Sequence, residues 1–244
     1  MACTRRSEEG AWAECGGKIV TKRRCVRFLP AGVAASPETD SGWGKMKKPT
    51  SSQEIQCVWF KRDLRVHDHR PLAEAAKRGP VVTVYVVEPE ILRAPDMDSL
   101  HWDFIREALR ELRAELKKRG GRLLVEIGEA VEVLESLRGR TGFVRLWSHE
   151  ETGNERSYRR DLRVAAWARE RSVQWTEWPQ SGVCRGLKNR DGWAGIWHRR
   201  MHEKPARTPD KIATPDNLPE EGDLVPPAYA GLDRYAARRQ VVAD

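Results

Sequence analysis

A group of charged side chains directly follows a short apolar run near residue 60. Residues 58–60 are Val, Trp and Phe, and Lys61, Arg62, Asp63 and Arg65 come next. A buried strand of an open parallel sheet ends in this way at a ligand crevice, because ligands bind outside the carboxyl ends of the strands. Lys61, Arg62 and Asp63 are therefore predicted to border such a crevice, where the three side chains could hold phosphate or polar ring groups of a ligand.

The same charges could instead brace the turn that carries them. In that reading Arg62 or Arg65 pairs with Asp63, Asp68 or Glu88. We favour the bracing role for Asp63 and Arg65 and leave both roles open for Lys61 and Arg62.

Two acidic residues follow the next predicted strand. Glu88 and Glu90 would lie beside the turn after residue 60 and could face the same ligand, although exposed carboxylates are common at strand ends.

Other residue combinations that could do chemistry are weak. His198 and His202 have a zinc-compatible i, i+4 spacing but no obvious third ligand, so a solvated helix face is expected and no metal site is predicted. No Ser/His/Asp or Cys/His nucleophile pattern is evident. The chain has no G-x-G-x-x-G, P-loop or Ser-Gly-Gly-x-Asp motif after a strand, which disfavours dehydrogenases, P-loop nucleotide enzymes and pyrophosphatase-type ATP enzymes.

Strand and helix patterns alternate through the middle of the chain. Strands are predicted over residues 55–60, 81–87, 123–127, 143–147 and 173–178, and helices over residues 71–78, 100–119, 129–137, 155–171 and 192–202. This alternation predicts an α/β fold with a Rossmann-like, doubly wound, five-stranded parallel sheet.

Helical spacing of apolar residues predicts which faces of the two longest helices are buried. In the helix over residues 100–119 these residues are Leu100, Phe104, Ala108, Leu109, Leu112 and Leu116. In the helix over residues 155–171 they are Tyr158, Leu162, Ala165 and Ala166.

The bulk properties bound the domain organisation. The net charge is +8, but residues 1–50 hold ten Lys or Arg against five Asp or Glu, so the rest of the chain carries only +3. Residues 1–54 are predicted to be a disordered extension, with Met46 as a possible natural start, and a basic targeting arm is the less favoured alternative. Residues 55–203 form the predicted domain, and residues 204–244 form a Pro-rich linker. Five cysteines without a C-x-x-C pair favour a reducing cytoplasm.

Several ordered motifs resemble one family. Residues 59–68 are similar to the opening signature of the DNA photolyase/cryptochrome family, residues 146–156 resemble its segment after the fourth strand, and residues 190–193 resemble the end of its N-terminal domain. The resemblance covers about residues 55–240. It implies an N-terminal α/β domain that can hold an antenna chromophore, which is a folate, a deazaflavin or FMN. A helical C-terminal domain of the family holds the catalytic FAD and contacts DNA.

The resemblance also sets the functional expectations. Family members repair pyrimidine dimers in DNA with light or signal in blue light, so the partners expected are the antenna chromophore and a helical domain, with DNA reached only through that domain and no membrane. The FAD domain is expected to be missing from this chain, so enzymatic activity is left open. The alternative is a stand-alone module that binds a nucleotide, flavin or single-stranded nucleic acid without catalysis.

One pair of site residues comes from the resemblance alone. In folate-binding members an Asn-Glu pair at the position of Asn154 and Glu155 contacts the antenna. The alternative is that Asn154 caps the following helix, with Glu155 in its first turn.

Overall fold

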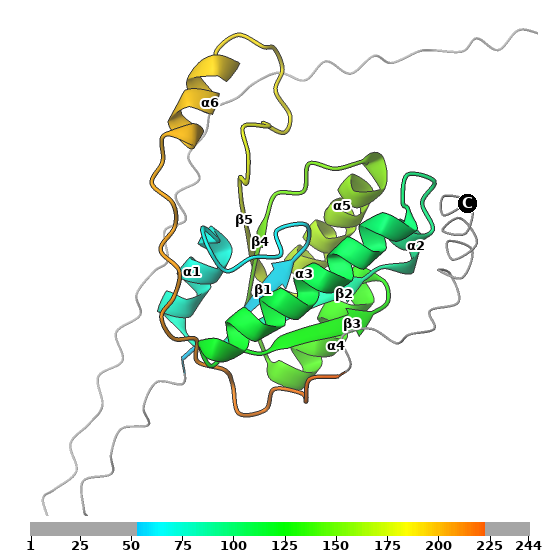
Figure 1. Cartoon of the computed structure of the whole chain (residues 1–244), viewed down its shortest axis with the longest axis vertical. Helices are drawn as coiled ribbons and strands as arrows, with labels where there is room; N and C mark the ends of the chain where they lie inside the picture. The colour runs from blue at the N-terminus through cyan, green and yellow to red at the C-terminus, as the bar shows by residue number, and fades with distance from the viewer. Residues whose placement is uncertain (1–52, 223–244) are drawn as a thin grey trace, which may run out of the picture. The chain divides into compact units, whose positions relative to one another are not determined.

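The computed structural model describes residues 53–222, in which strands and helices alternate (Figure 1). The strands are β1 (Gln56–Phe60), β2 (Val81–Val87), β3 (Leu123–Ile127), β4 (Arg145–His149) and β5 (Gln174–Trp178). The helices are α1 (Arg70–Arg78), α2 (Pro89–Leu92), α3 (Ser99–Lys118), α4 (Ala130–Thr141), α5 (Glu155–Glu170) and α6 (Trp193–Met201). Every strand pairs in parallel, in the order β3-β2-β1-β4-β5. The predicted five-stranded, Rossmann-like parallel sheet is confirmed.

Helices cover both faces of the sheet. Cys57 and Trp59 of β1 belong to the same apolar cluster as residues of α4 and α5, whereas Val58 and Phe60 pack with residues of α1 and α3. Successive side chains of a strand point to opposite faces, so β1 is buried along its whole length. The order of the strands changes direction beside β1, which makes this position the topological switch point of the sheet. An open α/β sheet forms its ligand crevice at such a point.

The predicted buried faces of the two long helices need correction. On α3, Leu109, Leu112 and Leu116 are buried as predicted, but Leu100 and Phe104 near its start are 68% and 73% exposed. On α5 the predicted face is wrong, because Tyr158 and Leu162 are about half exposed.

The buried face of α5 contains two charged residues. Arg160 and Asp161 lie inward together with Val164 and Trp167. Charged side chains are almost never buried unless they are paired, so their position already indicates a buried ion network at this helix.

The segment after α6 runs back over the domain. Ile212 and Leu218 are buried, each in one of the two main apolar clusters. The Ile212 backbone N–H donates to the Arg119 carbonyl at 2.7 Å, and the Val81 N–H donates to the Ala213 carbonyl at 2.7 Å. The predicted linker of residues 204–244 thus packs on the domain as far as residue 222. Its remainder, and residues 1–52 of the predicted extension, lie outside the described residues. Within residues 53–222, none of the helices has the length and apolar character that crossing a membrane requires.

Candidate functional site

A cavity of about 660 Å³ lies at the carboxyl ends of β1 and β2. We call it the crevice. One wall is apolar and comes from the α2–α3 segment, with Met97, Leu100, Phe104 and Ile105. Another wall is polar and comes from the ends of β1 and β2 and from the β4–α5 segment, with Lys61, Arg62, Glu88, Glu151 and Arg160.

The exposure of Leu100 and Phe104 is explained by this cavity. Both side chains have the helical spacing of a buried stripe, but the start of α3 lies beside the crevice instead of the sheet. Two large apolar side chains therefore border a ligand-sized space, and a molecule bound there would cover them.

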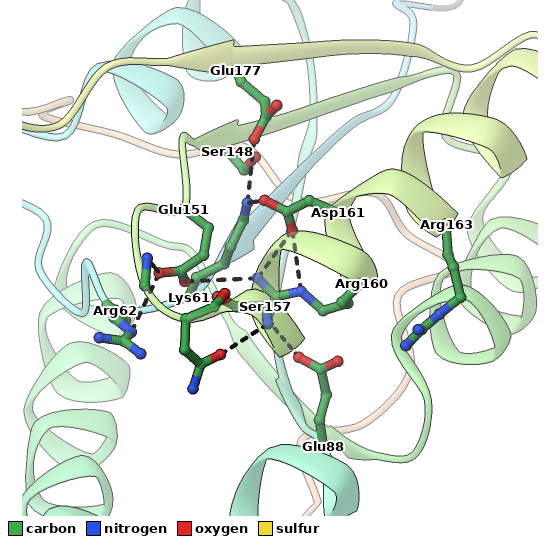
Figure 2. Close-up of polar contacts among 12 residues, drawn as sticks. Lys61, Arg62, Glu88, Ser148, Glu151, Ser157, Arg160, Asp161, Arg163 and Glu177 are labelled. Carbon is green, nitrogen blue, oxygen red and sulfur yellow. Dashed lines mark hydrogen bonds and ion pairs between the residues drawn. The ribbon is translucent and has the colours of Figure 1, made fainter. Parts of the chain in front are cut away.

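Lys61 is a buried cation at the end of β1. Its ammonium lies 3.2 Å from an Asp161 carboxylate oxygen and 3.4 Å from a Glu177 oxygen, as Figure 2 shows. The same ammonium lies 4.7 Å from the centre of the Trp59 ring, within cation–π range. Its charge is thus already partnered, and Lys61 contributes to the wall of the crevice as part of a network.

Arg160 connects the acidic residues of this network (Figure 2). Its guanidinium lies 2.7 Å from a Glu88 oxygen, 3.0 Å from an Asp161 oxygen and 3.6 Å from a Glu151 oxygen. Burial raises the pKa of the Glu88 carboxyl, and the opposing charge of Arg160 offsets this only in part. Arg160 was not predicted from the sequence, although an Arg-Asp pair inside an amphipathic helix after a crevice loop is a detectable signal.

Arg62 is the accessible cation of the polar wall. Its side chain is 65% exposed, and its Nε lies 3.3 Å from a Glu151 carboxylate oxygen. The sequence-predicted residues Lys61, Arg62 and Glu88 therefore all line the crevice. Arg65 braces the turn as expected, but its guanidinium donates to the backbone carbonyls of His67 and Asp68 rather than to an acid.

Asp63 is buried in a separate cluster and does not line the crevice. Its Oδ2 lies 2.7 Å from His69 Nε2 and 2.5 Å from His149 Nδ1, and its Oδ1 accepts from the Lys61 backbone N–H at 2.8 Å. Burial opposes the charge of Asp63, but the hydrogen bonds from His149 and His69 outweigh it and hold the pKa of this carboxyl well below its usual range. The bracing role favoured for Asp63 agrees with this geometry, with histidines instead of arginines as partners.

The Asp63, His69 and His149 ligand atoms lie within 4.8 Å of one another, which invites a metal interpretation. The hydrogen bonds argue against it. His69 Nδ1 accepts the Leu72 backbone N–H at 3.1 Å, so its Nε2 carries the hydrogen that Asp63 accepts. Burial lowers the pKa of His69, which keeps the ring neutral. Its Nε2 then has no lone pair for a metal, and the cluster is a closed hydrogen-bonded brace.

The remaining predicted residues lie at the outer rim. Asn154 caps α5, accepting from the Ser157 N–H at 3.1 Å, and its amide nitrogen donates to Asp96 at 2.7 Å. The capping role is confirmed, and Asn154 also borders the crevice. Glu155 pairs with Arg159 at 2.6 Å, and Glu90 lies 3.6 Å from Arg163. Neither Glu90 nor Glu155 lines the crevice, and both border a smaller hollow beside it.

The fold is an α/β domain with a crevice at the carboxyl ends of its strands, and comparison with known proteins places it in a family. The family model for DNA photolyase matches residues 56–185, which is more than half of the chain. The chain is 35% identical over 121 residues to cryptochrome DASH of Gloeobacter violaceus, covering 47% of this chain and 24% of that protein. It therefore belongs to the DNA photolyase family, which includes the cryptochromes, and corresponds to the N-terminal α/β domain.

Solved structures show the same fold. A bacterial class III photolyase from Agrobacterium tumefaciens matches with a TM-score of 0.61 at 19% identity, over 80% of this chain and 43% of that one. An archaeal photolyase from Sulfolobus tokodaii, solved with two FAD molecules and implying a novel light-harvesting cofactor, matches with a TM-score of 0.51 at 22% identity, over 66% of this chain and 37% of that one. The chain spans about a quarter of the length of the curated Gloeobacter relative.

Proposed function

We propose that the crevice binds a planar heteroaromatic antenna chromophore of the flavin or deazaflavin class. The observation that carries the proposal is the pairing of two walls. Leu100 and Phe104 contribute exposed apolar surface to the lining, and Arg62, Glu88 and Arg160 contribute polar groups to the same lining. A flat ring system with one polar edge and a polar side chain fits these walls, because ligand pockets combine apolar surface with a few fixed polar groups.

The geometry supports a flavin-type ligand better than a folate held by Asn154 and Glu155. Both functional groups of the Asn154 amide are engaged, by Ser157 and Asp96, and Glu155 is paired with Arg159. A pterin edge would have to displace these contacts. The Sulfolobus photolyase, solved with two FAD molecules, supports the same class of chromophore by analogy of fold.

The intact protein is proposed to use this chromophore in the role of its family, which is light-driven repair of pyrimidine dimers or blue-light signalling. That role requires an FAD-binding helical domain in addition to the residues of this chain. The chain is proposed to act in the cytoplasm as the antenna-binding part, with the chromophore and the helical domain as its partners.

Absorption spectroscopy tests the proposal directly. The purified chain is mixed with FMN, a deazaflavin or a reduced folate, freed of excess ligand, and its spectrum is recorded. We expect retention of FMN or the deazaflavin with a shifted absorption band. Retention of none of the three chromophores would refute antenna binding, and retention of folate alone would refute the crevice assignment.

A substitution on the apolar wall assigns the binding to the crevice. Phe104→Glu places a charge where a ring would lie, and we expect it to weaken chromophore binding by about tenfold or more, a change of about 1.4 kcal/mol. Leu162→Glu is the matched control, because Leu162 is a 52% exposed apolar residue of α5 outside the crevice lining. Equal weakening by both variants would contradict the assignment.

A further inference from the structure

A second cavity, of about 670 Å³, lies between α1, the segment after β5 and the segment after α6. We call it the basic pocket. Its cationic lining residues are Arg65, Arg70, Lys77, Arg200, Lys204 and Arg207, and its acidic ones are Asp68, Glu74 and Glu203. The basic pocket shares Arg65 with the crevice but is otherwise formed by different residues. Six cations against three acids leave an excess of three positive charges around one concave space.

Half of these cations have a carboxylate partner. Arg70 pairs with Glu203, Lys77 with Glu74, and Arg207 with Asp210.

The other three cations, Arg65, Arg200 and Lys204, form no ion pair with an acid among residues 53–222. Arg65 and Arg200 donate to backbone carbonyls, which leaves their positive charge uncompensated. The pocket therefore holds positive charge that an anion would neutralise.

A buried histidine faces the same space. The His149 side chain is 5% exposed and lines the basic pocket. Its Nδ1 is engaged by the Asp63 carboxylate, and within residues 53–222 its Nε2 has no hydrogen-bond partner. In the neutral ring this Nε2 can accept from a P–OH group, and in the protonated ring it can donate to a phosphate oxygen. The Nε2 atom of an otherwise buried side chain is thus left available at the pocket.

The surrounding segment concentrates positive charge that the rest of the domain lacks. Residues 179–207 contain seven Lys or Arg and two Asp or Glu, whereas the whole described range has 31 against 28. The excess over this one segment, five charges, is larger than the excess of three over residues 53–222. The positive charge is therefore local to the segment that carries one wall of the pocket, instead of being a property of the whole surface.

We propose that the basic pocket binds a phosphate group. A phosphate carries negative charge, and Arg65, Arg200 and Lys204 have no acidic partner among the described residues. Its oxygens can also hydrogen-bond to the His149 imidazole. Guanidinium groups recognise phosphate oxygens through paired N–H donors, which fits a pocket in which four of the six cations are arginines. The group can belong to a free phosphate or to the phosphodiester chain of a single-stranded nucleic acid. The inference is independent of chromophore binding, because it concerns a different cavity.

Calorimetric titration of the full chain, in a buffer free of phosphate, tests the proposal. The probes are inorganic phosphate, pyrophosphate and a short single-stranded DNA. Binding of phosphate or pyrophosphate supports the proposal with a small phosphate as the source. Binding of the oligonucleotide alone, with the variant pattern below, supports it with a nucleic acid as the source. If no probe binds at millimolar concentration, the proposal is wrong.

Two charge-reversal variants decide whether the pocket itself binds. Lys204→Glu with Arg207→Glu changes two exposed pocket cations, and we expect it to weaken binding by about tenfold or more, equivalent to about 1.4 kcal/mol. Lys188→Glu with Arg190→Glu is the matched control, with the same change in net charge on exposed residues of the same segment that do not line the pocket. We expect the control to weaken binding by no more than about twofold. Equal losses would show diffuse charge attraction and overturn the proposal. Circular dichroism of both variants verifies that they fold.

Discussion

The residues that end β1 lead into two buried polar clusters that differ in construction. Lys61 enters an ion network with Asp161 and Glu177 that borders the crevice. Asp63, two residues later, belongs to a closed cluster with His69 and His149 and does not line the crevice. The first cluster joins full charges of both signs, whereas the second surrounds one carboxylate with a neutral His69 and a second imidazole. Neighbouring charged residues at one strand end can thus serve a ligand wall and a structural brace at once.

The pKa values of the buried acids in the two clusters are shifted in opposite directions. The pKa of Glu88 in the crevice network is raised by burial, because Arg160 offsets that effect only in part. The pKa of Asp63 is lowered, because the two imidazole hydrogen bonds outweigh burial. The closed cluster therefore stabilises the charged form of its acid, and the crevice network does not do so for Glu88.

The largest effect is expected from breaking the closed cluster. Asp63→Asn removes the carboxylate oxygen that accepts from both imidazoles, and we expect a loss of about 3 kcal/mol in the free energy of unfolding, because buried donors to a charged acceptor lose their partner. Urea denaturation measures it. The control Asp191→Asn, at an exposed position before α6, should change stability by less than about 0.5 kcal/mol. A loss below about 1 kcal/mol for Asp63→Asn would refute the bracing role.

A moderate effect is expected on acidification. Burial lowers the folded-state pKa of His69 against the opposing effect of Asp63, so the unfolded chain takes up a proton first. The stability from neutral His69 is fully present above its unfolded pKa, about 6.5, and is lost as the pH falls from there through the lower folded pKa. The lowered pKa of Asp63 has the same sign but acts only below about pH 4. The raised pKa of Glu88 has the opposite sign and adds stability at low pH.

Urea midpoints measured between about pH 7 and pH 5 separate these contributions. The wild-type chain should lose stability across this range, and His69→Asn should flatten the loss. His198→Asn, which changes an exposed histidine of α6, should leave the slope of the wild-type chain intact. If the His69→Asn variant keeps the same dependence of stability on pH, that dependence belongs to another group.

The smallest effect is expected at the rim of the crevice. Glu155→Ala removes an exposed ion pair with Arg159 and should change stability by no more than about 0.5 kcal/mol. Because Glu155 does not line the crevice, retention of a flavin should not change. Asn154→Ala, which removes the cap of α5, should cost about 1 kcal/mol. Weaker folate binding in Glu155→Ala would favour the Asn-Glu folate pair over the crevice.

Much of the fold could be predicted because local patterns agree with it. The β-branched run of β2, the glycines after α3 and the apolar residues of β1 all indicate elements that the structure contains. The short α2 was missed, since four residues after Glu88 are too few for a helical period. The apolar residues at the start of α3 are exposed although their spacing predicts burial, because this part of the helix lies beside the crevice and not beside the sheet.

The site was less predictable because its residues meet across long sequence separations. The inward face of α5 was misassigned because Arg160 and Asp161 are buried by pairing with Glu88 and Lys61, and an apolar pattern does not register such pairs. Likewise, the bracing role of Asp63 was predicted with arginine partners, because its actual partner His149, from β4, lies 86 residues away in the chain. Lys61, Arg62 and Glu88 were correctly predicted to line the crevice, since parallel strand ends meet at one edge, but Asp63 and Glu90 do not line it.

The return of the chain across the domain has a consequence for how the protein folds. Ile212 and Ala213 hydrogen-bond to Arg119 and Val81, so the last described segment closes onto strands and helices formed early in the sequence. Such contacts join distant parts of the chain and require loop closure before they contribute stability. The sheet is therefore expected to assemble first, with the segment around Ile212 docking late. Amide exchange should accordingly report lower protection at Ile212 than in β2.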